Sequence, residues 1–212
     1  MREKIRDFVA RRISWSIIYK AMAYKTFPKF AAQYGDFRLG QDYGKLQVSG
    51  MASESKMIRG ELVKFASEIR GSVTSLLLPG ENNQNKQAFA DLFSLPASAA
   101  ITAGLLPEMD AYWDFEQDPP KLAPVSCIMS QAMLEHLIDP YKHVRDCYGL
   151  LEPGGHLIIH TQMPGFHYHR YPVDCLRFYP DWFEEVAKRL GAVVAAKHLH
   201  EAHIIYMLKK PA

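Results

Sequence analysis

One stretch of the chain, residues 130–155, combines helix and turn signals and runs directly into an apolar segment. It reads SQAMLEHLIDPYKHVRDCYGLLEPGG, and HLIIH follows at 156–160. Asp139-Pro140 predicts a turn, because the residue before a proline avoids helical backbone. Gly154 and Gly155 predict the end of the second helix. The pattern therefore predicts helical segments over 132–137 and 140–150, and then a strand over 156–161.

The same alternation extends in both directions from this stretch. Asp181 with Glu184 three residues later predicts a capping box at the start of a helix, and Gly191 predicts its end. A helix before the first strand turns five apolar residues inward: Met57, Ile58, Leu62, Val63 and Phe65. The full pattern predicts helices over 53–69, 85–93 and 181–190, and strands over 72–78, 99–103, 125–129, 192–198 and 203–208.

Strands that alternate with helices predict an α/β fold with a mostly parallel sheet. In such sheets ligands bind beyond the carboxyl ends of the strands. This rule places four segments along one edge of the predicted sheet: 79–84, 104–114, 130–131 and 161–177.

Composition narrows the class of protein. The chain has 212 residues, 48% hydrophobic and 23% charged, which suits one soluble domain with a sizeable core. No apolar run approaches the roughly 18–20 residues that span a bilayer. The three cysteines are too few for a disulfide framework, so we expect a reduced, cytoplasmic protein.

The net charge of +2 conceals a basic end. Residues 1–30 hold eight basic and two acidic residues, which leaves a charge of −4 for the remainder. Apolar residues from Ile5 to Ile18 follow a helical spacing over 2–23. This segment docks on an anionic membrane or partner, or packs on its own domain. We expect 1–50 to form a basic extension and 51–212 the main domain.

The stretch at 130–155 resembles the class I S-adenosylmethionine (SAM)-dependent methyltransferases, and more narrowly the type 11-like branch with an LEH…dP…L.PGG signature. The resemblance covers about 70–208. It implies a Rossmann-like sandwich around a mostly parallel seven-stranded sheet with an antiparallel last strand. It also implies SAM as cofactor and a small-molecule or glycan acceptor, with no nucleic-acid partner, since no basic patch follows residue 30.

The resemblance assigns the cofactor to the loops after the first, second and fourth strands. The first of these loops, LLLPGENNQ at 76–84, keeps a single glycine where the family has a glycine-rich turn, and Leu78 occupies the usual acidic position. An acid that contacts the ribose comes from Glu108 or Asp110. The implied cofactor residues are Gly80, Glu81, Asn82, Asp110, Asp114, Phe115, Ser130 and Gln131. The substituted loop leaves two functions open: a methyltransferase that retains SAM, and a non-catalytic subunit that has lost it.

The segment 160–178, HTQMPGFHYHRYPVDCLRF, is dense in ionisable and aromatic residues, and we expect it to cover the acceptor site. It resembles the H.yP.D.wRf segment of methyltransferases from polysaccharide gene contexts. Histidine suits the removal of a proton from an acceptor hydroxyl. The predicted catalytic residues are His160, His167 and His169, and the predicted acceptor contacts are Arg170, Tyr171, Asp174 and Arg177. Asp174 and Arg177 also lie at a spacing that allows them to pair with each other, and we predict no metal site.

Overall fold

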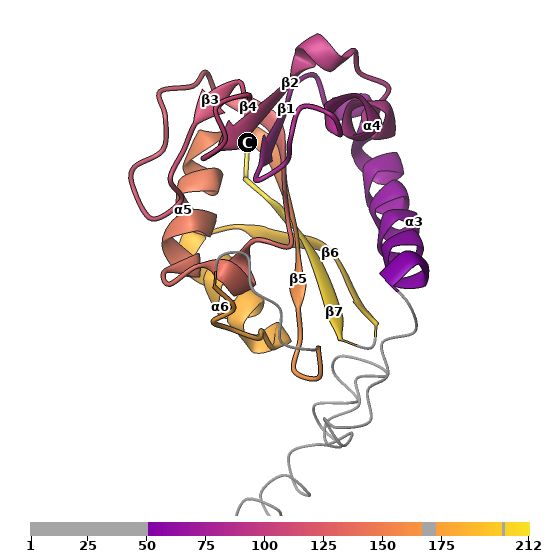
Figure 1. Ribbon diagram of the computed structural model, residues 1–212, viewed down its shortest axis with the longest axis vertical. Helices are drawn as coiled ribbons and strands as arrows, with labels where there is room; N and C mark the ends of the chain where they lie inside the picture. Colours follow the sequence, from indigo (N-terminus) through magenta and orange to yellow (C-terminus); the bar gives the residue numbers. More distant parts are fainter. Residues whose placement is uncertain (1–50, 167–172, 201) are drawn as a thin grey trace, which may run out of the picture. The chain divides into compact units, whose positions relative to one another are not determined.

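The computed structural model describes residues 51–166, 173–200 and 202–212 (Figure 1). Seven strands form one sheet in the order β3-β2-β1-β4-β5-β7-β6. The strands are β1 (Leu76–Pro79), β2 (Ala100–Gly104), β3 (Ala111–Tyr112), β4 (Val125–Gln131), β5 (Leu151–Gln162), β6 (Val193–His200) and β7 (His203–Lys209). Pairing is parallel from β3 to β5, and β7 is antiparallel to both of its neighbours. The predicted fold is confirmed. The predicted helix over 2–23 lies outside the described residues.

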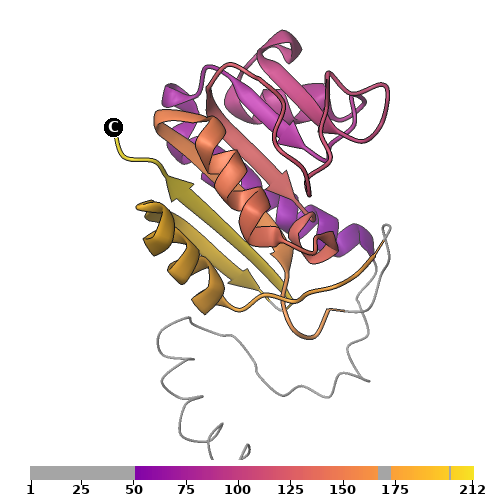
Figure 2. The same cartoon turned by 90° about the vertical axis from the view of Figure 1, so that its left-hand side faces the viewer.

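Helices cover both faces of the sheet (Figures 1 and 2). One face carries α3 (Met51–Ile69) and α4 (Lys86–Ala90), and the other carries α5 (Pro140–Leu150) and α6 (Pro180–Leu190). Short 3-10 turns connect these elements at Arg70–Ser72, Asp91–Phe93, Ala97–Ala99 and Leu134–His136. No helix within the described ranges is long and apolar enough to cross a membrane.

One part of the core lies between α3 and the sheet. Ile58, Leu62 and Phe65 of α3 are buried in one cluster with apolar side chains of β1, β4, β5 and β7. Val63, which was predicted to face inward, is 41% exposed. The buried residues of α3 are Ile58, Leu62, Phe65, Ala66 and Ile69, which span about 100° around the helix, and Val63 falls roughly 60° beyond that stripe because each residue turns the helix by about 100°.

Several predicted boundaries were wrong for identifiable reasons. β1 begins at Leu76 rather than at 72, because the backbone N–H groups of Thr74 and Ser75 donate to Ser126 Oγ instead of to a neighbouring strand. β5 begins at Leu151, which pairs with Val125 before a bulge interrupts the register. Helix 85–93 ends at Ala90 and continues as a 3-10 turn, and 132–137 contains only the 3-10 turn at Leu134–His136.

The predicted capping box of α6 is absent. Pro180 occupies the first helical turn and Tyr179 is the cap residue, so Asp181 already lies inside the helix. Proline is favoured at this position because its missing N–H would have no helical partner there. Glu184 instead accepts hydrogen bonds from Tyr206 Oη and Lys197 Nζ, at 2.9 Å each, and ties α6 to the last two strands. Gly191 ends the helix with φ +66°, as predicted.

Candidate functional site

A pocket of about 510 Å³ opens at the carboxyl edge of the sheet. The ends of β4 and β5, the start of β7, the turn after β1 and one side of α3 and α4 enclose it. Its location agrees with the edge predicted from strand order, although no residue of 104–114 lines it. Half of its lining side chains are apolar, and the polar ones are Arg59, Glu81, Asn85, Gln131, His160, Gln162 and His203.

The turn after β1 depends on Gly80. Its φ is +81°, a left-handed backbone that residues with a side chain rarely adopt. The Gly80 N–H donates to Ala103 O at 2.8 Å, which joins the turn to β2. The thioether of Met133 lies directly against the position that a Cβ would take at Gly80. At the end of β2, Met109 covers Gly104 in the same way, with Sδ 2.6 Å from such a Cβ.

The left-handed backbone at Ala132 directs the Met133 side chain onto Gly80. Ala132, just before Met133, has φ +49° and is one of two described non-glycine residues with positive φ. The Ala132 N–H donates to His160 O at 2.9 Å, so the turn after β4 is fixed to the end of β5. A left-handed alanine costs roughly 1–2 kcal/mol, and such strain concentrates at functional sites.

Polar residues around this turn mostly bond to each other. Asn82 Oδ1 accepts from the N–H groups of Gln84 and Asn85. Asp110, the predicted ribose contact, accepts from Lys86 Nζ at 2.7 Å and from Thr102 N at 2.8 Å. Its carboxylate therefore links α4 to β2. Glu81 lines the pocket and accepts from Asn85 Nδ2, and burial raises the pKa of the Glu81 carboxyl.

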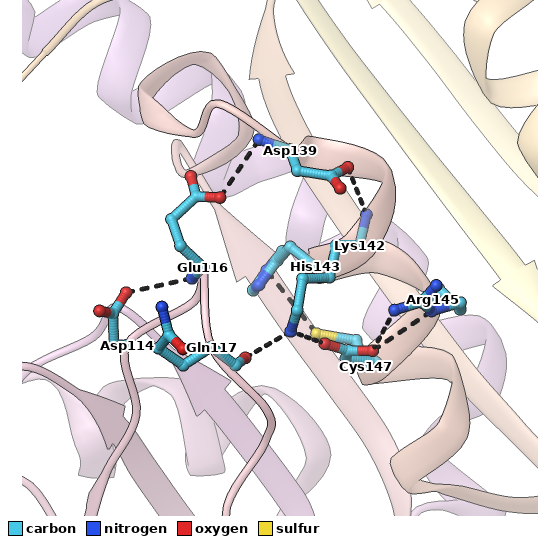
Figure 3. A network of polar contacts seen from close by, with 9 residues as sticks. Asp114, Glu116, Gln117, Asp139, Lys142, His143, Arg145 and Cys147 are labelled. Atoms are coloured by element: carbon cyan, nitrogen blue, oxygen red, sulfur yellow. Dashed lines mark hydrogen bonds and ion pairs between the residues drawn. The ribbon is translucent and has the colours of Figure 1, made fainter.

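Asp114 lies in a segment that is fastened to the start of α5 (Figure 3). Asp114 Oδ1 accepts from the N–H of Glu116, and Glu116 Oε1 accepts from the N–H of Ile138 at 2.7 Å. The Asp139 carboxylate caps α5 by accepting from Lys142 N. Lys142 Nζ in turn donates to Gln117 O and to Asp146. The position of Asp114 at the sheet edge is thus held by several contacts.

Two predicted cofactor residues belong to the core instead. Ser130 Oγ is hydrogen-bonded to His143 Nε2 at 2.9 Å under α5 and is 1% exposed. The Phe115 ring packs edge-on against Trp113 and His143, with centroids 5.0 and 4.9 Å away. Strand alternation turns Ser130 to the face opposite Gln131, and Phe115 lies beyond β3 and packs into the core, so neither side chain is where it was predicted. Of the predicted cofactor residues, only Glu81 and Gln131 line the pocket.

Two histidines meet in the pocket wall. His160 Nε2 lies 3.2 Å from His203 Nδ1, and the rings stack with centroids 5.3 Å apart. Burial, with a smaller contribution from His203, lowers the pKa of His160 to about 3. His160 therefore lines the pocket as a neutral imidazole and a weak proton acceptor. A hydrogen-bonding role suits it better than the predicted role of base, since an effective base has a pKa near the working pH.

Three buried polar atoms of pocket residues have no hydrogen-bond partner in the described part of the chain. They are Gln131 Oε1, His160 Nδ1 and Gln162 Oε1. His160 and Gln162 are only 2% and 4% exposed. Buried polar atoms are nearly always paired, so these three atoms are suited to hydrogen-bond a water or a ligand in the pocket.

Residues 173–178, which lead from β5 to α6, are held in place by hydrogen bonds to Glu135 and to Gln162. Glu135 is fully buried, its carboxylate accepts from Thr161 Oγ1 at 2.6 Å, and its carbonyl accepts from the N–H of Cys175 at 2.8 Å. The Gln162 carbonyl accepts from the N–H of Phe178 at 3.0 Å. Asp174 and Arg177 form a two-pronged ion pair, the alternative that the sequence allowed. His167, His169, Arg170 and Tyr171 lie outside the described residues, so their roles stay predictions.

Sequence reasoning missed Gln162, His203 and Glu135. A signal for Gln162 existed, because His160, Thr161 and Gln162 are three polar residues at the end of an apolar strand. His203 had no local signal, since its partner is 43 residues away in sequence. The LEH pattern gave the position of Glu135 but not its burial.

Searches for a matching protein-family model and for a similar curated protein found none. Solved structures do share the fold. A SAM-dependent methyltransferase from Mesorhizobium loti is 11% identical with a TM-score of 0.55, over 69% of this chain and 96% of that one. One from Archaeoglobus fulgidus is 11% identical with a TM-score of 0.53, over 73% and 94%. The [4+2]-cyclase SpnF is 9% identical with a TM-score of 0.51, over 71% and 81%.

These likenesses, together with the strand order, establish that the chain has the class I SAM-dependent methyltransferase fold. The cyclase in the same set is named for a different reaction. Fold alone therefore leaves the reaction open, and function has to be argued from the site.

Proposed function

We propose that the protein is a SAM-dependent methyltransferase that methylates an oxygen of a small molecule or of a glycan precursor. The supporting observation is the pocket at the carboxyl edge of the sheet, whose wall contains buried polar atoms without a partner among the described residues. A pocket at this edge that combines apolar side chains with several converging polar groups is typical of a ligand site in an α/β fold.

Part of the site fits the cofactor. Gly80 allows a ligand to approach the backbone after β1 closely, and the carboxylate of Glu81 can hold an ammonium group. Asp114 keeps one carboxylate oxygen for an exocyclic amine beyond its bond to Glu116. The thioether of Met133 must move away from Gly80, which an unbranched side chain does readily. When bound, SAM supplies an electrophilic methyl group.

On the acceptor side, residues of the chain have two roles: they orient the acceptor hydroxyl and they remove its proton. Neutral His160 and Gln162 orient an acceptor hydroxyl through hydrogen bonds. Removal of its proton falls to His167 or His169. Replacing both with glutamine is expected to lower turnover, measured as S-adenosylhomocysteine release, while the affinity for cofactor stays the same. Full turnover in the paired variant would assign the base elsewhere.

Calorimetric titration of the full chain with SAM and with S-adenosylhomocysteine tests the proposal directly. We expect saturable heat, and a melting temperature that rises with cofactor concentration because the ligand binds only the folded state. Glu81→Gln is expected to weaken binding, whereas Glu68→Gln, at an exposed position of α3, is the matched control. Absence of heat and of any melting shift at millimolar cofactor would refute the proposal.

The second candidate is a non-catalytic binding module that has lost the cofactor. The specific observation in its favour is the pair of methionines over Gly80 and Gly104, where the family places its cofactor loop and ribose contact. Leu78 at the end of β1 is fully buried and has no acidic group to offer. A folded protein that fails the titration but binds another ligand in the pocket would establish this candidate.

A further inference from the structure

The unpartnered atoms of the pocket wall belong to groups of one chemical kind. Gln131 and Gln162 carry primary amides, and each amide offers both a donor and an acceptor. His160 Nε2 is bonded to His203, so Nδ1 is the ring nitrogen of His160 that is left to donate or accept. Whichever way these groups turn, a hydroxyl complements them, because it also donates and accepts.

The charges around the pocket do not favour an anion. Among the described residues of the wall, Arg59 and Glu81 contribute one charge of each sign. Arg59 donates to Ala88 O at 3.4 Å, and Glu81 accepts from Asn85 at 3.1 Å. Near the paired histidines, the described lining residues offer amides and a neutral His160 imidazole rather than a cluster of arginines and lysines. Recognition of phosphate or carboxylate usually relies on such a cluster.

The remaining wall suits the non-polar face of a ring. Phe166 lies beside the paired histidines, with its ring 5.2 Å from that of His203 in an edge-on arrangement. Ile58, Leu62 and Phe89 contribute apolar side chains from α3 and α4. The Arg177 guanidinium lies over the Phe166 ring, 5.9 Å from its centroid. A wall that combines apolar and aromatic side chains with hydrogen-bonding groups matches a molecule with C–H faces and a rim of hydroxyls.

We propose that the pocket takes its acceptor as a neutral, hydroxyl-rich ring, a sugar bound through Gln131, Gln162 and His160. This rests on the proposed function and narrows its substrate class. It assigns sugar recognition to β4 and β5 rather than to the Asp174–Arg177 pair, whose charged groups bind each other.

Saturation-transfer NMR on the full chain tests this inference, with methyl α-glucoside, α-galactoside and α-mannoside as neutral probes. Glucose 6-phosphate and glucuronate are the charged probes. We expect transfer to at least one neutral glycoside, stronger than to either charged sugar. Gln162→Leu is expected to weaken that binding about tenfold, the scale of one lost buried hydrogen bond. Gln117→Leu, at an exposed position, is the control.

Each outcome decides the question. Stronger transfer to a charged sugar, or unchanged binding in Gln162→Leu, would overturn the inference. If Gln162→Leu melts early, Gln131→Leu at a half-buried position replaces it. S-adenosylhomocysteine is titrated into the same samples. Its binding without any glycoside binding refutes the sugar and leaves the methyltransferase proposal intact. Glycoside binding without it supports the sugar and the non-catalytic candidate.

Discussion

Around β1 and β2, the carboxyl edge of the sheet is filled by the chain itself. Met133 covers Gly80, and Met109 covers Gly104. The Asp110 carboxylate accepts hydrogen bonds from Lys86 and Thr102. Around β5 and β7, the same edge buries His160 and Gln162 with polar atoms that have no partner in the described residues.

This difference shows two ways in which a ligand site can appear without its ligand. A flexible thioether can cover a glycine at little cost and leave when a ligand arrives. A buried amide or imidazole cannot be satisfied by rearranging its apolar neighbours, so its pairing needs water or a ligand. The unpaired polar atoms near β5 are therefore the stronger evidence for ligand binding. The covered glycines near β1 and β2 are the features that decide whether the protein still binds the cofactor.

The largest expected effect concerns the packing of Met133 on Gly80. Gly80→Ala is expected to lower the free energy of unfolding by about 3 kcal/mol, from a left-handed backbone cost and an overpacking cost. Gly154→Ala is the matched control, because Gly154 has φ +80° and no atom near its missing Cβ. It should lose only about 1–2 kcal/mol. Denaturant unfolding measures both, and equal losses would show that Met133 does not press on Gly80 in solution.

The pH dependence of unfolding tests whether the buried histidines, His160 at the β5 side among them, are shielded from water. Burial lowers the pKa of His143 to about 4 and of His160 to about 3, so the unfolded state binds these protons more tightly. Stability is then lost as the pH falls below about 6.5, by about 2 kcal/mol per histidine at pH 5. His160→Gln should remove one share of this loss and His143→Gln the other. If His160→Gln leaves the pH dependence of unfolding unchanged, water already reaches that ring.

Asp114→Ala is expected to weaken SAM binding about tenfold, because it removes an acceptor for the adenine amine. Calorimetry measures the affinity. Asp118→Ala, at an exposed position of the same loop, controls for general loop changes. An unchanged affinity for Asp114→Ala would remove this residue from the cofactor site.

The smallest expected effect is a gain. Met133→Ala should raise the affinity for S-adenosylhomocysteine about threefold, since the ligand no longer has to displace a side chain from Gly80. Leu105→Ala, at a position 56% exposed beside β2, is the control. A loss of affinity in Met133→Ala would mean that the methionine forms part of the cofactor wall rather than a cover over it.

The strands were predictable wherever burial on both faces leaves an apolar run. LLL at 76–78, VSCIM at 125–129 and HLIIH at 156–160 all lie within observed strands. The start of β5 was not predictable, because Pro153, Gly154 and Gly155 indicate a turn while the chain keeps pairing from Leu151. The cap of α6 was misplaced because Pro180 takes the first helical position.

The candidate site was predictable as a place and less so as a set of residues. Strand order alone located the edge, the family resemblance put Glu81 and Gln131 there, and the polar-aromatic segment put His160 there. The Ser130 side chain lies in the core because one residue along a strand reverses the face. Phe115 lies beyond β3, and its burial against Trp113 and His143 is a long-range contact. His203 was missed because its role comes from the antiparallel insertion of β7 beside β5, a long-range pairing that no local pattern encodes.

That insertion also bears on the order of events during folding. β7 follows β6 along the chain yet lies between β5 and β6 in the sheet, so the later of the two strands takes the interior position. Until residues 203–209 pair with β5, that edge of β5 has no neighbour and His160 has no ring to stack on. A folding intermediate in which β7 has not yet joined the sheet therefore exposes an open strand edge that can pair with other chains. The pocket wall at His160 is complete only once β7 is in place.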